Sequence, residues 1–103
     1  MIAQMYNYNT WIEETNPVSL YKYFYELLEQ SGFKIENYIE KNFYPYGYTS
    51  LFLLSESHFA IHTFPEENKS YIELTSCVKN PFDKFLLIIK QNKKIHESSK
   101  SDT

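Results

Sequence analysis

Apolar positions along the chain follow two spacings, one typical of helices and one typical of strands. Between an Asn16-Pro17 capping signal and Gly32, large apolar residues recur every three or four positions, which predicts an amphipathic helix. Asn80-Pro81 is a second signal of this kind, and the helix that follows it is expected to end in the lysine-rich residues 90–94. The two apolar stripes consist of Leu20, Phe24, Leu27 and Leu28, and of Phe82, Phe85, Leu86 and Ile89.

Short apolar or alternating segments predict the strands. They are residues 2–9, 33–43, 48–55, 58–64 and 70–77. Asn37 is expected to mark a β-bulge within its strand. Residues 10–14 are a predicted connector, and Pro45-Tyr46-Gly47 and residues 65–69 are predicted turns.

These elements predict an α+β fold, a two-layer sandwich in which a mostly antiparallel sheet carries two helices on one face. We summarise their order as β-α-β-β-β-α. The 103 residues suffice for one domain, which we assign to residues 1–95. Residues 96–103, rich in Ser and Lys and preceded by a polar stretch, are expected to be a flexible polar tail.

Charge and cysteine content narrow the class of protein. The net charge is −3 and every cationic residue is lysine, which argues against a nucleic-acid-binding protein and leaves no arginine for bidentate binding of a phosphate. A single cysteine excludes an internal disulfide, and no segment resembles a signal peptide or a membrane span. We therefore expect a cytoplasmic protein that binds neither nucleic acid nor membrane.

The most unusual segment is residues 51–65, LFLLSESHFAIHTFP. A buried strand is interrupted by the polar sequence Ser-Glu-Ser-His before a second strand begins. Ser57, His58 and His62 lie within six residues, so two of the three histidines are next to an acid-flanked serine. Metal binding is a poor explanation, because the His58–His62 spacing pairs ligands on a helix and the lone cysteine completes no familiar set.

The segments Leu54-Ser-Glu-Ser-His58, Ile61-His-Thr63, Pro65-Glu66 and Thr75-Ser-Cys77 resemble the bacterial and archaeal class of S-adenosylmethionine decarboxylase. The resemblance implies a zymogen that cuts itself between Glu56 and Ser57, when the Ser57 hydroxyl attacks the Glu56 carbonyl. Elimination and hydrolysis then leave a pyruvoyl group derived from Ser57 as the covalent cofactor. Its ketone forms a Schiff base with an amine substrate and serves as an electron sink.

The same resemblance assigns roles to other residues. His62 moves protons during processing, and Cys77 returns a proton after carbon dioxide leaves. Thr49, Ser55 and His58 are expected to support processing. Phe43 is the residue expected to stack on adenine, and Glu66 the one expected to meet the ribose or the sulfonium end of the substrate.

One geometric difficulty is visible in the sequence. Ser57 and His62 are separated by an odd number of positions, so in a straight strand their side chains point to opposite faces of the sheet. They can meet within one chain only if the backbone turns or bulges at Ser57.

The resemblance implies decarboxylation of S-adenosylmethionine, which supplies the aminopropyl donor for spermidine and other polyamines. It also implies a homodimer with the sites at the subunit interface. One alternative is a pyruvoyl-dependent decarboxylase of ornithine or arginine. Another is a truncated, non-catalytic relative that acts as a binding or regulatory subunit, because the family typically continues with a further strand where this chain has a polar tail.

Overall fold

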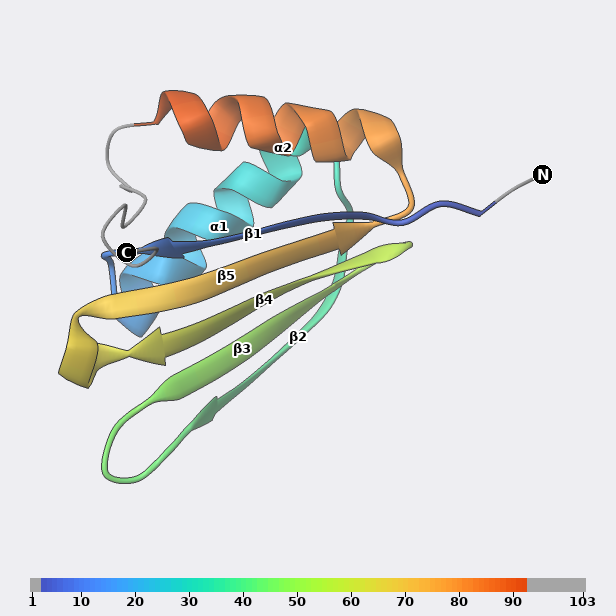
Figure 1. Ribbon diagram of the computed structural model, residues 1–103. Helices are drawn as coiled ribbons and strands as arrows, with labels where there is room; N and C mark the ends of the chain where they lie inside the picture. The colour runs from blue at the N-terminus through green and yellow to red at the C-terminus, as the bar shows by residue number, and fades with distance from the viewer. Residues whose placement is uncertain (1–2, 93–103) are drawn as a thin grey trace.

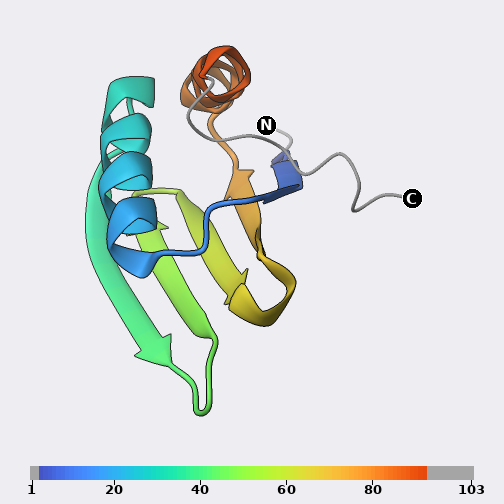
Figure 2. The ribbon, with the colours of Figure 1, turned by 90° about the vertical axis from the view of Figure 1, so that its left-hand side faces the viewer.

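The computed structural model describes residues 3–92 and has two layers, a five-stranded antiparallel sheet and a pair of helices that both lie on one face of it (Figure 1). The spatial order of the strands is β1-β5-β4-β3-β2. In the view turned by 90°, both helices remain on the same side of the sheet (Figure 2). The elements are β1 (Tyr6–Ile12), α1 (Pro17–Ser31), β2 (Ile35–Asn42), β3 (Tyr48–Leu54), β4 (Ser57–Phe64), the 3-10 turn η1 (Pro65–Glu67), β5 (Lys69–Ser76) and α2 (Lys79–Gln91).

The predicted α+β two-layer sandwich is confirmed. The summarised order β-α-β-β-β-α is one strand short, because four strands separate the two helices, one for each segment predicted there. The predicted tail, residues 96–103, lies outside the described residues. Neither helix within residues 3–92 is both long and apolar enough to cross a lipid bilayer.

Helix α1 begins and ends where its local signals predict. The Asn16 side chain accepts a hydrogen bond of 3.0 Å from the Ser19 backbone N–H, and Pro17 occupies the first turn. Gly32 ends the helix with φ of 103°, a left-handed conformation that is open to glycine and strained for other residues. The predicted bulge in β2 is also present, since the pairing with β3 shifts between Ile35 and Asn37.

Several predicted boundaries are wrong, and β1, for example, begins at Tyr6 rather than at residue 2. Strand β1 extends to Ile12 rather than ending at residue 9, because Ile12 is fully buried and pairs with Ser70 of β5. Helix α2 begins at Lys79, so Asn80 is inside it and the capping position is Val78, which offers no side-chain hydrogen bond. Pro81 is tolerated there because a proline in the first turn removes only a backbone N–H that has no partner within the helix.

The β3–β4 hairpin determines which residues face the helices. Leu54 pairs directly with Ser57, so Ser55 and Glu56 alone form the turn. Buried and accessible positions then alternate along β4, with Ser57, Phe59, Ile61 and Thr63 buried on the helix side. The other face of the sheet has no helix over it, and we call it the open face; it carries Ile39, Thr49, Leu51, Leu53, His58, Ala60, His62 and Glu73.

Aromatic rings join the two layers. Phe59 of β4 is fully buried, and its ring centroid lies 4.7 Å from that of Phe24 in α1 and 5.6 Å from that of Phe85 in α2. Phe52 of β3 extends the cluster, with its ring centroid 6.0 Å from that of Phe59. The Phe59 side chain thus contacts both helices from the sheet.

Replacing Phe59 by Ala should lower the free energy of unfolding by about 3–5 kcal/mol, because it leaves a cavity between the layers. Leu87→Ala is the matched control, since Leu87 is 59% exposed on α2 and its loss should cost less than about 0.5 kcal/mol. Urea denaturation of both variants measures the difference, and equal losses would show that the interlayer cluster does not depend on Phe59.

Candidate active site

The Glu56–Ser57 peptide bond lies where the β3–β4 turn meets the end of β5. The Glu56 carbonyl oxygen accepts a 3.5 Å hydrogen bond from the Cys77 backbone N–H and lies 3.3 Å from Cys77 Sγ. The Glu56 carboxylate oxygen Oε1 is 3.5 Å from the same sulfur. The predicted cleavage bond and the predicted proton donor are therefore in direct contact, although they are far apart in the sequence.

The Ser57 hydroxyl is also held by a residue that the sequence did not single out. It donates a 2.7 Å hydrogen bond to Ser76 Oγ, and both serines are buried. Ser76 in turn accepts from the Val78 N–H at 2.9 Å and donates to the Val78 carbonyl at 3.2 Å. Its position beside Cys77 was visible in the sequence, but its pairing with Ser57 depends on the β4–β5 register. We call Glu56, Ser57, Ser76 and Cys77 the turn cluster.

The Cys77 thiol favours its protonated form. Desolvation raises the pKa of Cys77 above its usual value, and the hydrogen bond and negative charge of Glu56 raise this pKa further, against a smaller lowering by the Cys77 backbone N–H. At neutral pH the group next to the Glu56 carbonyl is consequently a thiol that can donate a proton.

His62 lies in a different place, on the open face. Its Nδ1 is 2.9 Å from Oγ1 of Thr49, the cross-strand neighbour on β3. Thr49, which was predicted to support processing, thus contacts the His62 ring directly. The His62 ring also stacks against Tyr71 of β5, with centroids 6.3 Å apart, and the Tyr71 hydroxyl donates to Glu73 at 3.2 Å. Tyr71 has no role among the sequence predictions, and its contact with His62 depends on the β4–β5 register.

Two neighbouring cavities surround His62. The larger, of about 500 Å³, runs over the open face and includes His58, Leu51 and Ala60 among its lining residues. The smaller, of about 260 Å³, includes Glu66 and Tyr46. Phe43, Thr49 and His62 line both cavities. Four residues predicted separately thus meet here, and we call Phe43, Thr49, His62 and Glu66 the open-face cluster.

The two clusters are apart within one chain. Ser57 and His62 point to opposite faces of β4, and five residue steps of about 3.3 Å place them about 16 Å apart along the strand. No bulge interrupts the pairing of β4 at Ser57, so the local distortion that would bring these side chains together is absent from this strand. Ser55 lies at the turn end, where its hydroxyl donates to Glu36 at 2.8 Å rather than contacting His62. His58 is exposed on the open face near that same end.

Comparison with known proteins identifies relatives over most of the chain. A family model described as S-adenosylmethionine decarboxylase matches residues 2–101. S-adenosylmethionine decarboxylase proenzyme 2 of Bacillus cereus is 49% identical over 49 residues, which are 48% of this chain and 40% of that protein. The S-adenosylmethionine decarboxylase proenzyme of Thermosipho melanesiensis is 32% identical over 77 residues, 75% of this chain and 58% of that protein. The aligned segments thus span less than two thirds of these relatives.

A solved structure shares the fold. The crystal structure of the adenosylmethionine decarboxylase from Aquifex aeolicus superimposes with a TM-score of 0.56 and 18% sequence identity, covering 93% of this chain and 88% of that one. The two-layer arrangement is accordingly found in that enzyme as well.

The contact between Glu56 and Cys77 predicts a pH effect. In an uncut Ser57→Ala chain, alkylation of Cys77 by iodoacetamide should have its midpoint above that of cysteine in a short unstructured peptide. Adding Glu56→Gln should move the midpoint to lower pH, because a negative charge that opposes the thiolate is removed. Mass spectrometry follows the reaction without ambiguity, since Cys77 is the only cysteine. Glu67→Gln is the control, and an unchanged midpoint in the Glu56→Gln chain would contradict the assignment.

Proposed function

The chain belongs to the S-adenosylmethionine decarboxylase family, as its sequence motifs predict, and from this premise we propose that it is a self-cleaving proenzyme. It cuts its backbone between Glu56 and Ser57 and then converts S-adenosylmethionine to decarboxylated S-adenosylmethionine, the aminopropyl donor for spermidine synthesis. The observation that carries this proposal is the turn cluster, in which the Ser57 hydroxyl and the Glu56 carbonyl are each held by a hydrogen-bonding neighbour.

The contacts of that cluster support the proposed route of self-cleavage. Ser57 Oγ attacks the Glu56 carbonyl carbon while its proton moves toward Ser76 Oγ. Negative charge develops on the Glu56 oxygen, where the Cys77 N–H and thiol are placed to stabilise it. The C–N bond breaks to give an ester between Glu56 and Ser57. Loss of the Ser57 Cα proton expels the Glu56 carboxylate, and water converts the remaining dehydroalanine into the pyruvoyl end with release of ammonia.

The residues around Ser57 fit a pyruvoyl group. Ser57 begins β4 at a buried position, and Cys77 is close enough to protonate a carbon bound there. Such a group supplies a ketone that condenses with the substrate amine and accepts the electron pair released with carbon dioxide. Cys77 then donates its proton to the former carboxylate-bearing carbon, which the raised pKa of its thiol permits at neutral pH.

The open-face cluster suits the other end of the substrate. The Phe43 ring is 46% exposed and lines both cavities, so it can stack on adenine. Glu66 lines the smaller cavity, where its carboxylate can accept hydrogen bonds from ribose hydroxyls or attract the sulfonium charge. Thr49 contacts His62 Nδ1, so that the imidazole is oriented for proton transfer during processing.

The proposed enzyme is a homodimer, and the separation of the two clusters within one chain supports this part of the proposal. Ser57 of one protomer meets His62, Phe43 and Glu66 of the partner subunit, so each site forms between two chains. The open face supports this arrangement, because large apolar side chains are exposed on it: Ile39 is 61% exposed and Leu53 is 49% exposed. Packing this face against a second copy removes that surface from water and encloses the cavities.

Processing is tested by intact mass under denaturing conditions. We expect two fragments, residues 1–56 and 57–103, with the second lacking a free N-terminal amine, and a single uncut species for Ser57→Ala. Ser76→Ala should slow cleavage by roughly tenfold or more, because Ser57 loses its hydrogen-bond acceptor. Ser76→Thr keeps a hydroxyl and should restore the rate. Cleavage of Ser76→Ala at the rate of the unmodified chain would remove Ser76 from the mechanism, and an uncut natural chain would refute the proposed function.

Mixed dimers test the shared site and the substrate together. One chain carries Ser57→Ala and the other carries Phe43→Ala with Glu66→Gln, so each alone should release almost no carbon dioxide from S-adenosylmethionine. Coexpression should restore about a quarter of the natural activity, because half of randomly formed dimers are mixed and each contains one complete site. Ornithine and arginine should release none. An inactive mixture of folded dimers would place each site within one chain, and release from ornithine alone would overturn the assigned substrate.

A further inference from the structure

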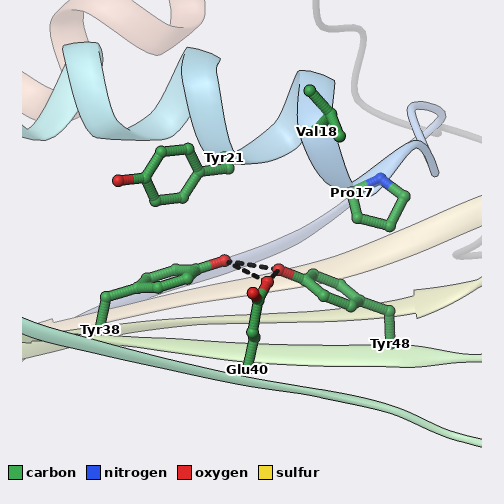
Figure 3. A pocket seen from close by; sticks show the side chains of 6 residues that line it. All are labelled: Pro17, Val18, Tyr21, Tyr38, Glu40 and Tyr48. Carbon is green, nitrogen blue, oxygen red and sulfur yellow. Dashed lines mark hydrogen bonds between the residues drawn. The ribbon is translucent and has the colours of Figure 1, made fainter.

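A third cavity lies on the helix side of the sheet, between α1 and strands β2 and β3 (Figure 3). It has a volume of about 400 Å³ and is lined by Pro17, Val18, Tyr21, Tyr38, Glu40 and Tyr48. Neither the turn cluster nor the proposed decarboxylation chemistry accounts for it. Its most distinctive feature is a carboxylate placed between two phenol groups.

Both phenols contact the same oxygen of Glu40. The Tyr38 hydroxyl donates to Glu40 Oε1 at 3.3 Å, and the Tyr48 hydroxyl donates to the same atom. The two hydroxyls also contact each other. Figure 3 shows the two rings approaching Glu40 from either side, with their oxygens converging on it. Within residues 3–92, Glu40 Oε2 accepts no hydrogen bond, so one carboxylate oxygen remains available to a ligand.

Among the residues that the structure describes, no cationic side chain forms an ion pair with the Glu40 carboxylate. The ion pairs of the described residues involve Glu36, Glu67 and Asp83 as the acids, and no lysine lines the cavity. Desolvation raises the pKa of both Tyr38 and Tyr48, and the interactions of Tyr48 with Glu40 raise it further, so both phenols stay protonated and neutral. The cavity accordingly presents the Glu40 carboxylate together with the lone pairs of two phenol oxygens.

The opposite wall is aromatic and aliphatic. Tyr21 of α1 faces the Glu40 side chain across the cavity in Figure 3, and its ring centroid is 4.8 Å from that of Tyr38. Electron-rich ring faces attract organic cations. Pro17 and Val18 form the remaining wall, and Val18 is 76% exposed although it is apolar. A ligand that suits all the walls has a compact cationic head and a short apolar chain.

We propose that this cavity binds an alkylammonium ion, with its N–H groups directed at Glu40 Oε2 and the phenol oxygens of Tyr38 and Tyr48. The ammonium head also faces the Tyr21 ring, and the alkyl chain lies along Pro17 and Val18. The partial positive charge of the α1 N-terminus disfavours the opposite orientation. An anion is disfavoured by Glu40, and a divalent metal ion by the lack of a second carboxylate; no group of three metal-ligating side chains occurs among residues 3–92.

The test uses full-length protein with ¹³C-labelled tyrosine rings, titrated with n-butylammonium and followed by NMR. Saturable shifts of the Tyr21, Tyr38 and Tyr48 signals are expected, with none for n-butanol, which has the same chain and no charge. Glu40→Gln should weaken binding by about tenfold or more, because a charge-assisted hydrogen bond is lost. Glu36→Gln is the control, since it removes an equal charge from the same strand outside this cavity.

Tyr38→Phe supplies a second test, because it keeps the ring and removes one oxygen; binding should weaken while the thermal unfolding midpoint stays close to that of the natural chain. Equal affinities in the natural and Glu40→Gln proteins, or shifts that stay linear throughout the titration, would overturn the proposal. Tetramethylammonium binding as tightly as n-butylammonium would also overturn it, because that ion cannot donate hydrogen bonds. These binding measurements do not depend on self-cleavage, so their failure is distinct from failure of the proposed decarboxylase function.

Discussion

The two-residue turn at Ser55-Glu56 is the constraint on which the arrangement of functional groups depends. By pairing Leu54 with Ser57, it sets the register of β3 against β4 and so decides the face to which each side chain of the hairpin points. A slip of one residue would move Phe59 from the interlayer core to the open face and His62 in the opposite direction. The aromatic contacts of Phe59 with Phe24 and Phe85 oppose such a slip, so packing and register stabilise each other.

This register divides the candidate chemistry between two regions of the protomer. At the turn, the Glu56–Ser57 peptide bond lies between the hydrogen-bonded hydroxyls of Ser57 and Ser76 and the thiol of Cys77. This arrangement is suited to breaking the backbone. The residues around His62 surround two cavities with an exposed aromatic ring and a carboxylate, an arrangement suited to holding a substrate. Since a rigid strand separates the two regions, the proposed enzyme depends on a second subunit. In the proposed dimer, the apolar open face serves both as the contact between the subunits and as one wall of each site.

The helix side of the sheet is packed differently near its two helices. Near α2, aromatic side chains pack between the layers, and Phe59 and Phe85 are fully buried there. Near the N-terminus of α1, the tyrosines of β2 and β3 direct their hydroxyls to Glu40 instead, and a cavity remains. Tyr38 and Tyr48 are large enough to span the layers, but their hydroxyls need polar partners. Their partner is Glu40 on the edge strand β2, and the cavity lies beside its side chain.

Local patterns in the sequence were sufficient for the elements whose ends are set by neighbouring residues. Asn16, Pro17 and Gly32 define α1 through contacts within a few positions, and the bulge near Asn37 and the turn at residues 45–47 are equally local. The motifs around Ser57 and Cys77 predicted the family, and the odd spacing of Ser57 and His62 already implied opposite faces, because side chains alternate along any regular strand.

Tertiary structure decided what depends on pairing between distant segments. The end of β1 at Ile12 and the start of α2 at Lys79 follow from burial and from the position of β5, neither of which leaves a local signal. Ser76 and Tyr71 acquire partners only because β4 and β5 align as they do. Glu40 lies between two tyrosines only because β2 pairs with β3 in this register. Sequence spacing specifies how a side chain is directed within its own element, whereas the neighbour it meets depends on how separate elements pack.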